Sequence, residues 1–405
     1  GHSYSRTAAF FANGTYSYQG KYNLNGTIRY EGSNMLGRSR SARWLPTWNI
    51  SGSWNMHEEK FFDIFRPTLS HFTLKASYSL TADRGPASIT NSTSIFSAYN
   101  PYRPFSTDKE SGIALYQTGN NELTYEKKHE WNFGVDAGFL NNRINVTLDV
   151  YRRNNYDLIG VVNTQGVNRS VISYGNVASM KSHGEELSIS TTNIKNKDFS
   201  WTTNFIYSHA VNEVTELMSQ ANTMDYISGS GFAMTGYPVR ALFSIPFVGL
   251  NENGYPMFIN EKGNVTTTDI NFQERDNNSY LKYEGPTDPV YTGSLGNIFT
   301  YKGFRLNIFL TYSFGNVVRL DPVFSYKYND LSSMTKEFKN RWMMPGDEKV
   351  TNVPVILSKR EYNDNYELHY GYNAYNYSTE RVAKGDFIRM KEISFGYDFP
   401  SKWFK

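Results

Sequence analysis

The sequence contains no cysteine, and this excludes disulfide bonds, thiolate nucleophiles and thiolate metal ligands. It also lacks any stretch near the roughly 18 consecutive apolar residues that a membrane-spanning helix requires. An excess of one charge is missing too, because 41 basic residues stand beside 38 acidic ones. This balance leaves no basic footprint for nucleic acid, so we expect no nucleic-acid partner.

Recognisable catalytic and metal-binding patterns are absent as well. No pair among the 7 histidines has the spacing of a helical zinc motif, and no Gly-x-Ser-x-Gly elbow or phosphate-binding glycine loop occurs. Glu185 and Glu186 are neighbours on an expected strand, where they would point to opposite faces. They therefore form no ready acid–base couple. We expect no catalytic residue, no metal and no cofactor.

Aromatic side chains in a two-residue alternation are abundant, with 31 Tyr and 27 Phe in the chain. Between residues 22 and 30, one parity holds Tyr22, Leu24, Gly26, Ile28 and Tyr30, while the other holds Asn23, Asn25, Thr27 and Arg29. The two parities of a strand lie on opposite faces. An apolar face with aromatic residues at both ends and a polar opposite face is typical of a transmembrane β-barrel.

About eleven segments read as strands of this kind, which predicts an all-β fold: part of a transmembrane antiparallel β-barrel. They lie at about 6–18, 22–32, 48–55, 72–80, 131–139, 144–151, 185–194, 201–207, a segment ending at 301, 304–312 and 387–398. The last strand mixes charged and apolar residues on one parity, so alternation alone does not predict which of its faces contacts lipid.

The connections alternate between short and long. Tight turns are expected near residues 19, 141, 196 and 302, and long polar stretches at 83–123, 153–180, 215–289 and 315–384. Outer-membrane barrels have this rhythm, with short periplasmic turns and long extracellular loops. The connection at 56–68 breaks it, and we expect a short helix or packed turn there. Gly184 is expected to allow a bend where loop passes into strand.

The same alternation also fits one other fold class and one other function. A soluble β-sandwich, as in a secreted enzyme or adhesin, would use strands of about 5–6 residues and shorter loops. A passive porin or structural barrel would share the strands. An open sheet edge is not viable in hydrocarbon, and bacterial barrels have even strand counts. We therefore expect further strands to complete the barrel, and we interpret the chain, which begins Gly1-His2-Ser3, as partial.

Several segments resemble SusC-like (SusC/RagA) TonB-dependent transporters of Bacteroidetes outer membranes. They include residues 16–62, GNVASMKSHGEELSIS, YTGSLGNIFTYKGFRLNIFLTYSFGN, RWMMPGDEKVTNVP and FIRMKEISFGYDFP, in the order of the family. The resemblance implies a barrel of about 22 strands with an internal plug. It implies that residues 1–405 are the C-terminal part of that barrel, without the plug domain or TonB box.

The same resemblance implies a function. It predicts outer-membrane import of an oligosaccharide, or alternatively an oligopeptide, with outer-membrane lipid around the barrel. A SusD-like lipoprotein would close over the loops, and TonB would act through the absent N-terminal region. Within the sequence, Tyr-rich residues 362–377 suit stacking on sugar faces or contact with a partner protein. The candidate ligand-binding residues are Tyr366, Tyr370, Tyr372 and Tyr375, with Tyr102 and Arg103 as weaker ones. Loop self-packing or an aromatic collar at the membrane is the alternative for the Tyr-rich segment.

Overall fold

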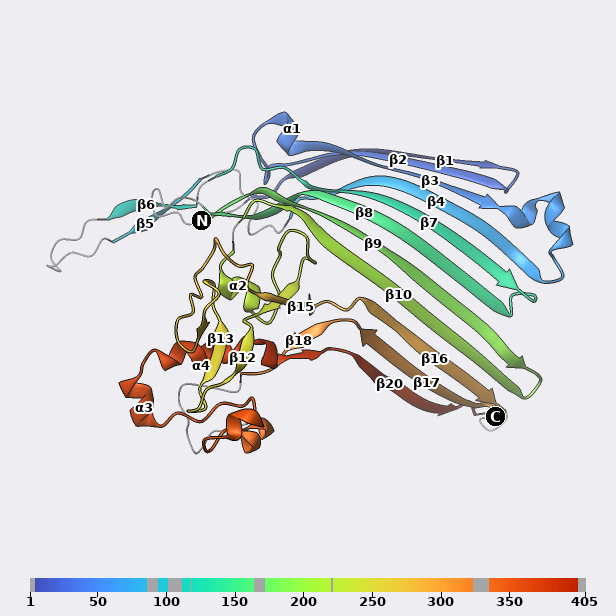
Figure 1. Ribbon diagram of the computed structural model, residues 1–405. Helices are drawn as coiled ribbons and strands as arrows, with labels where there is room; N and C mark the ends of the chain where they lie inside the picture. Colours follow the sequence, from blue (N-terminus) through green and yellow to red (C-terminus); the bar gives the residue numbers. More distant parts are fainter. Residues whose placement is uncertain are drawn as a thin grey trace. The chain divides into compact units, whose positions relative to one another are not determined.

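A computed structural model describes residues 4–85, 94–100, 111–117, 119–163, 172–219, 221–322 and 335–399. The chain divides into two compact units, and Figure 1 labels most of their helices and strands. The sheet unit comprises residues 1–219, 291–312 and 388–405. The loop unit comprises residues 220–290 and 313–387.

The main sheet has 11 strands, each beside its neighbour in the chain except where the β5–β6 hairpin or the strands of the loop unit intervene. They are β1 (Thr7–Tyr18), β2 (Tyr22–Ser33), β3 (Trp44–Asn55), β4 (Leu69–Asp83), β7 (Glu126–Phe139), β8 (Ile144–Asn163), β9 (Ile172–Lys195), β10 (Phe199–Leu217), β16 (Tyr291–Tyr301), β17 (Phe304–Phe314) and β20 (Phe387–Tyr397). The eleven predicted strands are confirmed, and so is the antiparallel sheet. A separate hairpin, β5 (Ile95–Tyr99) and β6 (Gly112–Gln117), lies between β4 and β7.

Strands β8 and β9 are longer than predicted, with 20 and 24 residues. A strand of this length spans roughly 65–80 Å, whereas the apolar band of a barrel is only about 25 Å tall. The parts outside the band need no apolar parity, and their polar sequence reads as loop. Alternation therefore reveals only the portion of a strand that crosses lipid.

One end of the sheet, here called the turn end, carries the short connections. Gln19 and Gly20 have φ of 52° and 71°, and Lys302 and Gly303 have φ of 43° and 91°. Positive φ at both central residues is what a two-residue hairpin turn of matching twist requires. Between β9 and β10, the Asn196 side chain accepts hydrogen bonds from the backbone N–H groups of Asp198 at 3.1 Å and Phe199 at 2.8 Å. The predicted tight turns are confirmed.

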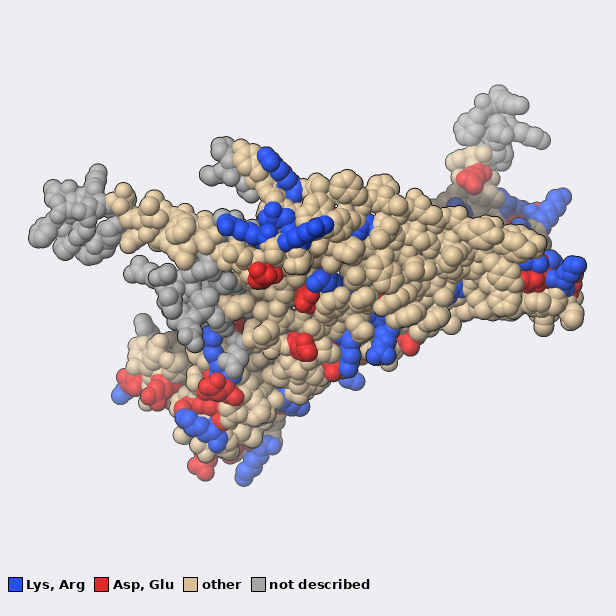
Figure 2. Space-filling model, turned by 90° about the horizontal axis from the view of Figure 1, so that it is seen from above, with Lys and Arg blue, Asp and Glu red and all other residues tan. Residues whose placement is uncertain are grey.

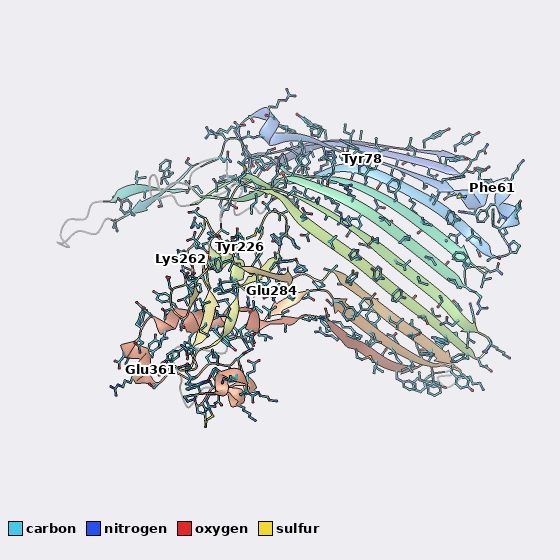
Figure 3. The ribbon with its side chains drawn as sticks, in the orientation of Figure 1. Phe61, Tyr78, Tyr226, Lys262, Glu284 and Glu361 are labelled. Carbon is cyan, nitrogen blue, oxygen red and sulfur yellow. The ribbon has the colours of Figure 1, made fainter. Side chains whose placement is uncertain are left out.

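The exception at 56–68 is a packed turn, as predicted. Two 3₁₀ helices, η1 (Met56–Glu58) and η2 (Lys60–Ile64), occupy it, and Phe62 of η2 is buried. Glu59 fixes the segment to the neighbouring hairpin, because it accepts from the Tyr22 hydroxyl at 2.6 Å and from Lys21 Nζ at 2.9 Å. Phe61, labelled in Figure 3, marks this connection at the turn end.

The two faces of the sheet differ as the alternation predicts. On the apolar face, Leu24 and Ile28 are each 54% exposed and Ile50 is 56% exposed, so none of them lies in a dry protein core. On the polar face, Arg29 pairs with Glu31, and Lys75 pairs with Asp136 across neighbouring strands. A sheet that leaves large apolar side chains open on one whole face is suited to lipid rather than water.

Aromatic pairs border the apolar face at both ends. Tyr22 stacks on Trp54 at 6.2 Å near the turn end, and Tyr30 stacks on Trp44 at 5.1 Å near the opposite, loop end. The eight-residue step from Tyr22 to Tyr30 spans ~27 Å along a strand, or ~21 Å after the usual barrel tilt. This spacing matches the aromatic girdles that bound a membrane band of about 25 Å.

The structure settles the face of β20, which alternation left open. Phe304 on β17 contacts Phe395 at 5.6 Å and Tyr397 at 4.4 Å between ring centroids. The odd-numbered residues of β20 therefore share the face of Phe304, while Glu392 accepts from Asn307 Nδ2 at 3.2 Å. Cross-strand neighbours, which the sequence of one strand does not contain, decide the face.

The expected bend at Gly184 is wrong. Gly184 lies inside β9, and a Cβ there would come within 2.5 Å of the Tyr151 hydroxyl and 2.4 Å of the His209 carbonyl oxygen. The glycine instead leaves room for the Tyr151 ring on the neighbouring strand, which is a close approach rather than a turn.

The long connections β10–β16 and β17–β20 are not open loops but fold together as the loop unit. Its strands are β11 (Ala241–Ser244), β12 (Phe247–Leu250), β13 (Pro256–Ile259), β14 (Val265–Thr266), β15 (Lys282–Pro286), β18 (Val317–Arg319) and β19 (Val382–Lys384). Its helices are α2 (Thr223–Ile227), α3 (Lys359–Asp364), α4 (Leu368–Asn376) and the 3₁₀ turns η4 (Lys336–Asn340), η5 (Asp347–Lys349) and η6 (Thr379–Arg381). Ile227, Phe243, Phe258 and Phe338 are among its core residues. No helix in the described part of the chain is long and apolar enough to cross a membrane.

Arg319 holds the two connections together inside this unit. Its Nη1 donates to Ser244 Oγ at 3.1 Å and to the Ser378 carbonyl at 2.9 Å. Its Nη2 donates to the carbonyls of Phe243 at 2.6 Å and Ile227 at 3.2 Å. Burial lowers the pKa of Arg319 to about 10, against the opposing effect of nearby Glu284, so the guanidinium stays charged at neutral pH. Tyr226 and Glu284 are labelled in Figure 3.

The apolar face predicts how a charge is tolerated on β3. Replacing Ile50 by arginine should destabilise the full-length protein in lipid vesicles by about 2–4 kcal/mol, because the charge enters the lipid-facing band. Replacing the adjacent Ser51, on the opposite parity, should cost less than half as much. Equilibrium urea unfolding in vesicles measures both, and equal losses would contradict the assignment of faces.

The hydrogen bonds of Arg319 predict a local loss of stability. Arg319→Met removes the guanidinium donor of three buried carbonyls, of which the Ser378 carbonyl keeps its hydrogen bond from the Arg381 N–H at 3.0 Å. The variant should weaken the loop unit by about 3–5 kcal/mol. Hydrogen exchange at α2 and β11 should accelerate by at least ~100-fold, while exchange in β1–β4 stays unchanged. Arg360→Met is the control, because the Arg360 side chain is 91% exposed. Unaltered hydrogen exchange in the Arg319→Met variant would show that the hydrogen bonds of Arg319 do not stabilise the loop unit.

Candidate functional site

The Tyr-rich segment predicted as a ligand surface forms α3, α4 and the turn between them. Tyr372 and Tyr375 are only 6% and 3% exposed. The Tyr372 hydroxyl donates to the Val355 carbonyl at 2.6 Å, and Tyr375 packs against Phe247 at 5.7 Å between centroids. Burial raises the pKa of both tyrosines. These two residues are therefore core residues of the loop unit, and the expectation that they offer free rings for stacking is corrected.

The other two predicted tyrosines are exposed. Tyr366 is 61% exposed and Tyr370 is 42% exposed. The His369 ring stacks on Tyr366 at 5.8 Å and meets Tyr370 edge-on at 6.1 Å. The ring centroids of Tyr362 and Tyr366 lie 6.5 Å apart. We call these four residues the aromatic group. His369 was not among the predicted residues, although it lies within the same Tyr-rich segment.

The turn that follows Trp342 is a second ordered feature of the loop unit. Asp347 Oδ2 accepts from the backbone N–H groups of Met343 at 2.9 Å and Met344 at 3.0 Å, and Gly346 has a φ of 105°. Trp342 donates to Glu348 at 3.1 Å and lies over Gly254, where a Cβ would come within 2.5 Å of the indole. This Pro345-Gly346 turn leaves both methionines exposed.

A hollow of about 460 Å³ opens on the polar face of the sheet unit. Its lining includes Arg29, Glu31, Thr47, Asn49 and Tyr125. Tyr125 is 3% exposed, burial raises its pKa to about 12, and its hydroxyl has no hydrogen-bond partner in the described part of the chain. The sequence did not predict this hollow. Its lining combines residues of β2, β3 and β4 with Tyr125, which precedes β7, and the pattern of one strand does not show such a meeting.

Two predicted residues, Tyr102 and Arg103, lie outside the described residues. Within the described ranges, no cluster of three or more histidine, aspartate or glutamate side chains could hold a metal ion. What the arrangement offers chemically is a polar sheet face with ion pairs and a partly exposed aromatic group on a separate folded unit. Both features suit reversible contact with a polar ligand.

Comparison with known proteins agrees with this architecture. Residues 1–321 match the family described as TonB dependent receptor-like, beta-barrel. TonB-dependent receptor P39 of Formosa agariphila is 27% identical over 433 residues, which cover 97% of this chain and 40% of the relative. TonB-dependent receptor SusC of Bacteroides thetaiotaomicron is 26% identical over 416 residues, which cover 98% of this chain and 38% of SusC. The chain thus spans about 40% of the curated relatives that it matches.

A solved structure shares the fold. The structure of the RagAB peptide transporter superposes with a TM-score of 0.78 at 21% identity, over 99% of this chain and 42% of the transporter chain. The predicted resemblance to the SusC/RagA type is confirmed. Since the family match covers most of the sequence, the chain belongs to the TonB-dependent receptor-like β-barrel family and is an outer-membrane protein.

Proposed function

We propose that this chain is the C-terminal part of the barrel of a nutrient importer. The support is the open sheet: among the described strands, β1 and β20 each pair on one side only. An unpaired edge in hydrocarbon costs several kcal/mol per backbone group, so other strands of the complete protein must close it. The plug and the TonB box belong to that remainder, and the curated relatives are more than twice as long as this chain.

The proposed activity is TonB-dependent import of an oligosaccharide with a SusD-like lipoprotein. The single observation that carries it is the family match over a sheet whose polar face is lined by ion pairs and hydrogen-bonding side chains. Such a face suits passage of a hydrated solute. The aromatic group supplies rings with polar edges, which stack on sugar faces. We propose that the chain itself performs no catalysis, because its family is one of receptors.

An oligopeptide is the second candidate cargo. The observation in its favour is the fold shared with the RagAB peptide transporter. Peptides also bind aromatic and hydrogen-bonding side chains, so the aromatic group does not separate the two cargoes by itself. The distinction must come from direct binding.

Uptake by cells tests the importer. Cells that express the full-length protein should accumulate labelled oligosaccharide, and deletion of either its gene or the gene for TonB should abolish accumulation. Persistent uptake without TonB would favour a passive porin and overturn the proposal. Uptake of labelled peptides but not of oligosaccharides would retain the importer and replace its cargo.

The aromatic group predicts a specific loss of affinity. The Tyr366→Ala/Tyr370→Ala double variant of the full-length protein should bind oligosaccharide about 5- to 150-fold more weakly, since each stacked ring contributes about 0.5–1.5 kcal/mol. Isothermal titration calorimetry measures the affinity. The Asn363→Ala/Glu367→Ala variant changes exposed, non-aromatic neighbours and should bind normally. If both variants bind like the wild type, the aromatic group is not a ligand surface.

A further inference from the structure

A hollow of about 420 Å³ lies on the apolar face of the sheet unit, near its loop end. One side of it is aromatic, with Phe10, Tyr30 and Trp44, and the other is basic, with Arg38, Arg40 and Arg43. We call the latter residues the arginine triad. Figure 2 shows basic side chains gathered at this end of the sheet, on the face that carries α1 (Arg40–Arg43).

The aromatic side belongs to the lipid-facing parity. Phe10 pairs with Tyr30 in the β1–β2 ladder, and Trp44 pairs with Gly32 in the β2–β3 ladder. The Trp44 ring lies directly on Gly32, where a Cβ would come within 2.4 Å of the indole. Tyr and Trp at such positions mark the boundary between hydrocarbon and headgroups. The hollow therefore opens at headgroup level, not into the polar interior of the barrel.

The segment that carries the triad is held firmly. Leu36 is fully buried and packs with Leu123 and Tyr125 in a small core. The backbone N–H groups of Gly37 and Arg38 donate to the carbonyls of Leu123 at 2.7 Å and Asn121 at 2.9 Å. Arg43 Nε donates to the Gly37 carbonyl at 3.2 Å. The guanidinium groups thus project from a packed segment rather than from a free loop.

The triad concentrates positive charge. In the described part of the chain no carboxylate forms an ion pair with Arg38, Arg40 or Arg43, and the first two are exposed. Arg29, on the opposite face of β2, instead pairs with Glu31. Three neighbouring guanidinium groups without an acidic partner call for an external anion, and planar guanidinium groups bind phosphate oxygens in pairs.

We propose that the arginine triad and its aromatic wall bind the phosphorylated headgroup of a lipid in the outer leaflet. The triad supplies charge for the phosphate, while Phe10, Tyr30 and Trp44 contact the sugar or acyl portion just below it. This assignment rests on the loop end facing the cell exterior, as the long connections indicate. It does not depend on the imported cargo.

Lipid binding by the detergent-solubilised full-length protein tests the proposal. The Arg38→Gln/Arg40→Gln variant keeps the Arg43 hydrogen bond and should bind diphosphorylated lipid A about 30-fold more weakly, since each basic residue at a membrane surface contributes roughly fivefold. Native mass spectrometry measures the bound lipid. The matched control is Lys195→Gln/Lys197→Gln, which removes two exposed cations at the turn end and should leave the affinity unchanged.

Two further arms identify the ligand. Dephosphorylated lipid A, with the same acyl chains, should bind the wild type as weakly as phosphorylated lipid A binds the Arg38→Gln/Arg40→Gln variant. Inorganic phosphate in large excess should not displace the lipid; displacement would identify a soluble-anion site and overturn the lipid assignment. Equal binding of diphosphorylated lipid A by the wild type and the Arg38→Gln/Arg40→Gln variant would overturn the lipid assignment as well. Unchanged heat-modifiable migration on gels establishes that each variant is folded.

Discussion

Backbone hydrogen bonding is the constraint on which this structure depends. Hydrocarbon offers no partner for an N–H or C=O group, so every strand that crosses it must pair on both sides. The antiparallel ladder from β1 to β20 meets this demand for all strands but the two at its edges. Register follows from the same demand, because a slip by one residue would exchange the lipid-facing and water-facing side chains. Leu24 would then face water, and Asn25 would face lipid.

Outside the bilayer the constraint is relaxed, and ordinary burial in water takes over. The loop unit illustrates this, because it has what the sheet unit mostly lacks: a core of buried apolar side chains around Phe243 and Phe258. Its polar backbone is satisfied by side chains as well as by strands, as Arg319 shows with carbonyls drawn from both connections. One chain thus follows opposite rules for placing apolar residues in its two units.

The same contrast explains how far the sequence could predict the structure. The eleven strands were predictable because lipid imposes a two-residue period on each of them. The loop unit was not, since its short elements carry no sustained period. Tyr366, Tyr370, Tyr372 and Tyr375 were grouped by composition alone. Their burial differs because α4 turns Tyr372 and Tyr375 towards the core of the loop unit. There Tyr372 contacts Val355 and Tyr375 contacts Phe247, neither of which belongs to the Tyr-rich segment.

How a charged side chain is neutralised in this fold depends on the face of the sheet that carries it. Arg29 and Arg38 are close in sequence and belong to the same end of the sheet. Arg29 lies on the polar parity, where Glu31 neutralises it beside the inner hollow. Arg38 lies beside the aromatic wall of the apolar face, with no acidic partner in the described ranges. Water solvates the first pair whether or not a solute is present. At the lipid boundary, by contrast, an uncompensated cluster is stabilised only if the membrane itself provides the counter-charge. The arrangement of charges at this end of the barrel therefore complements both of the media that it separates.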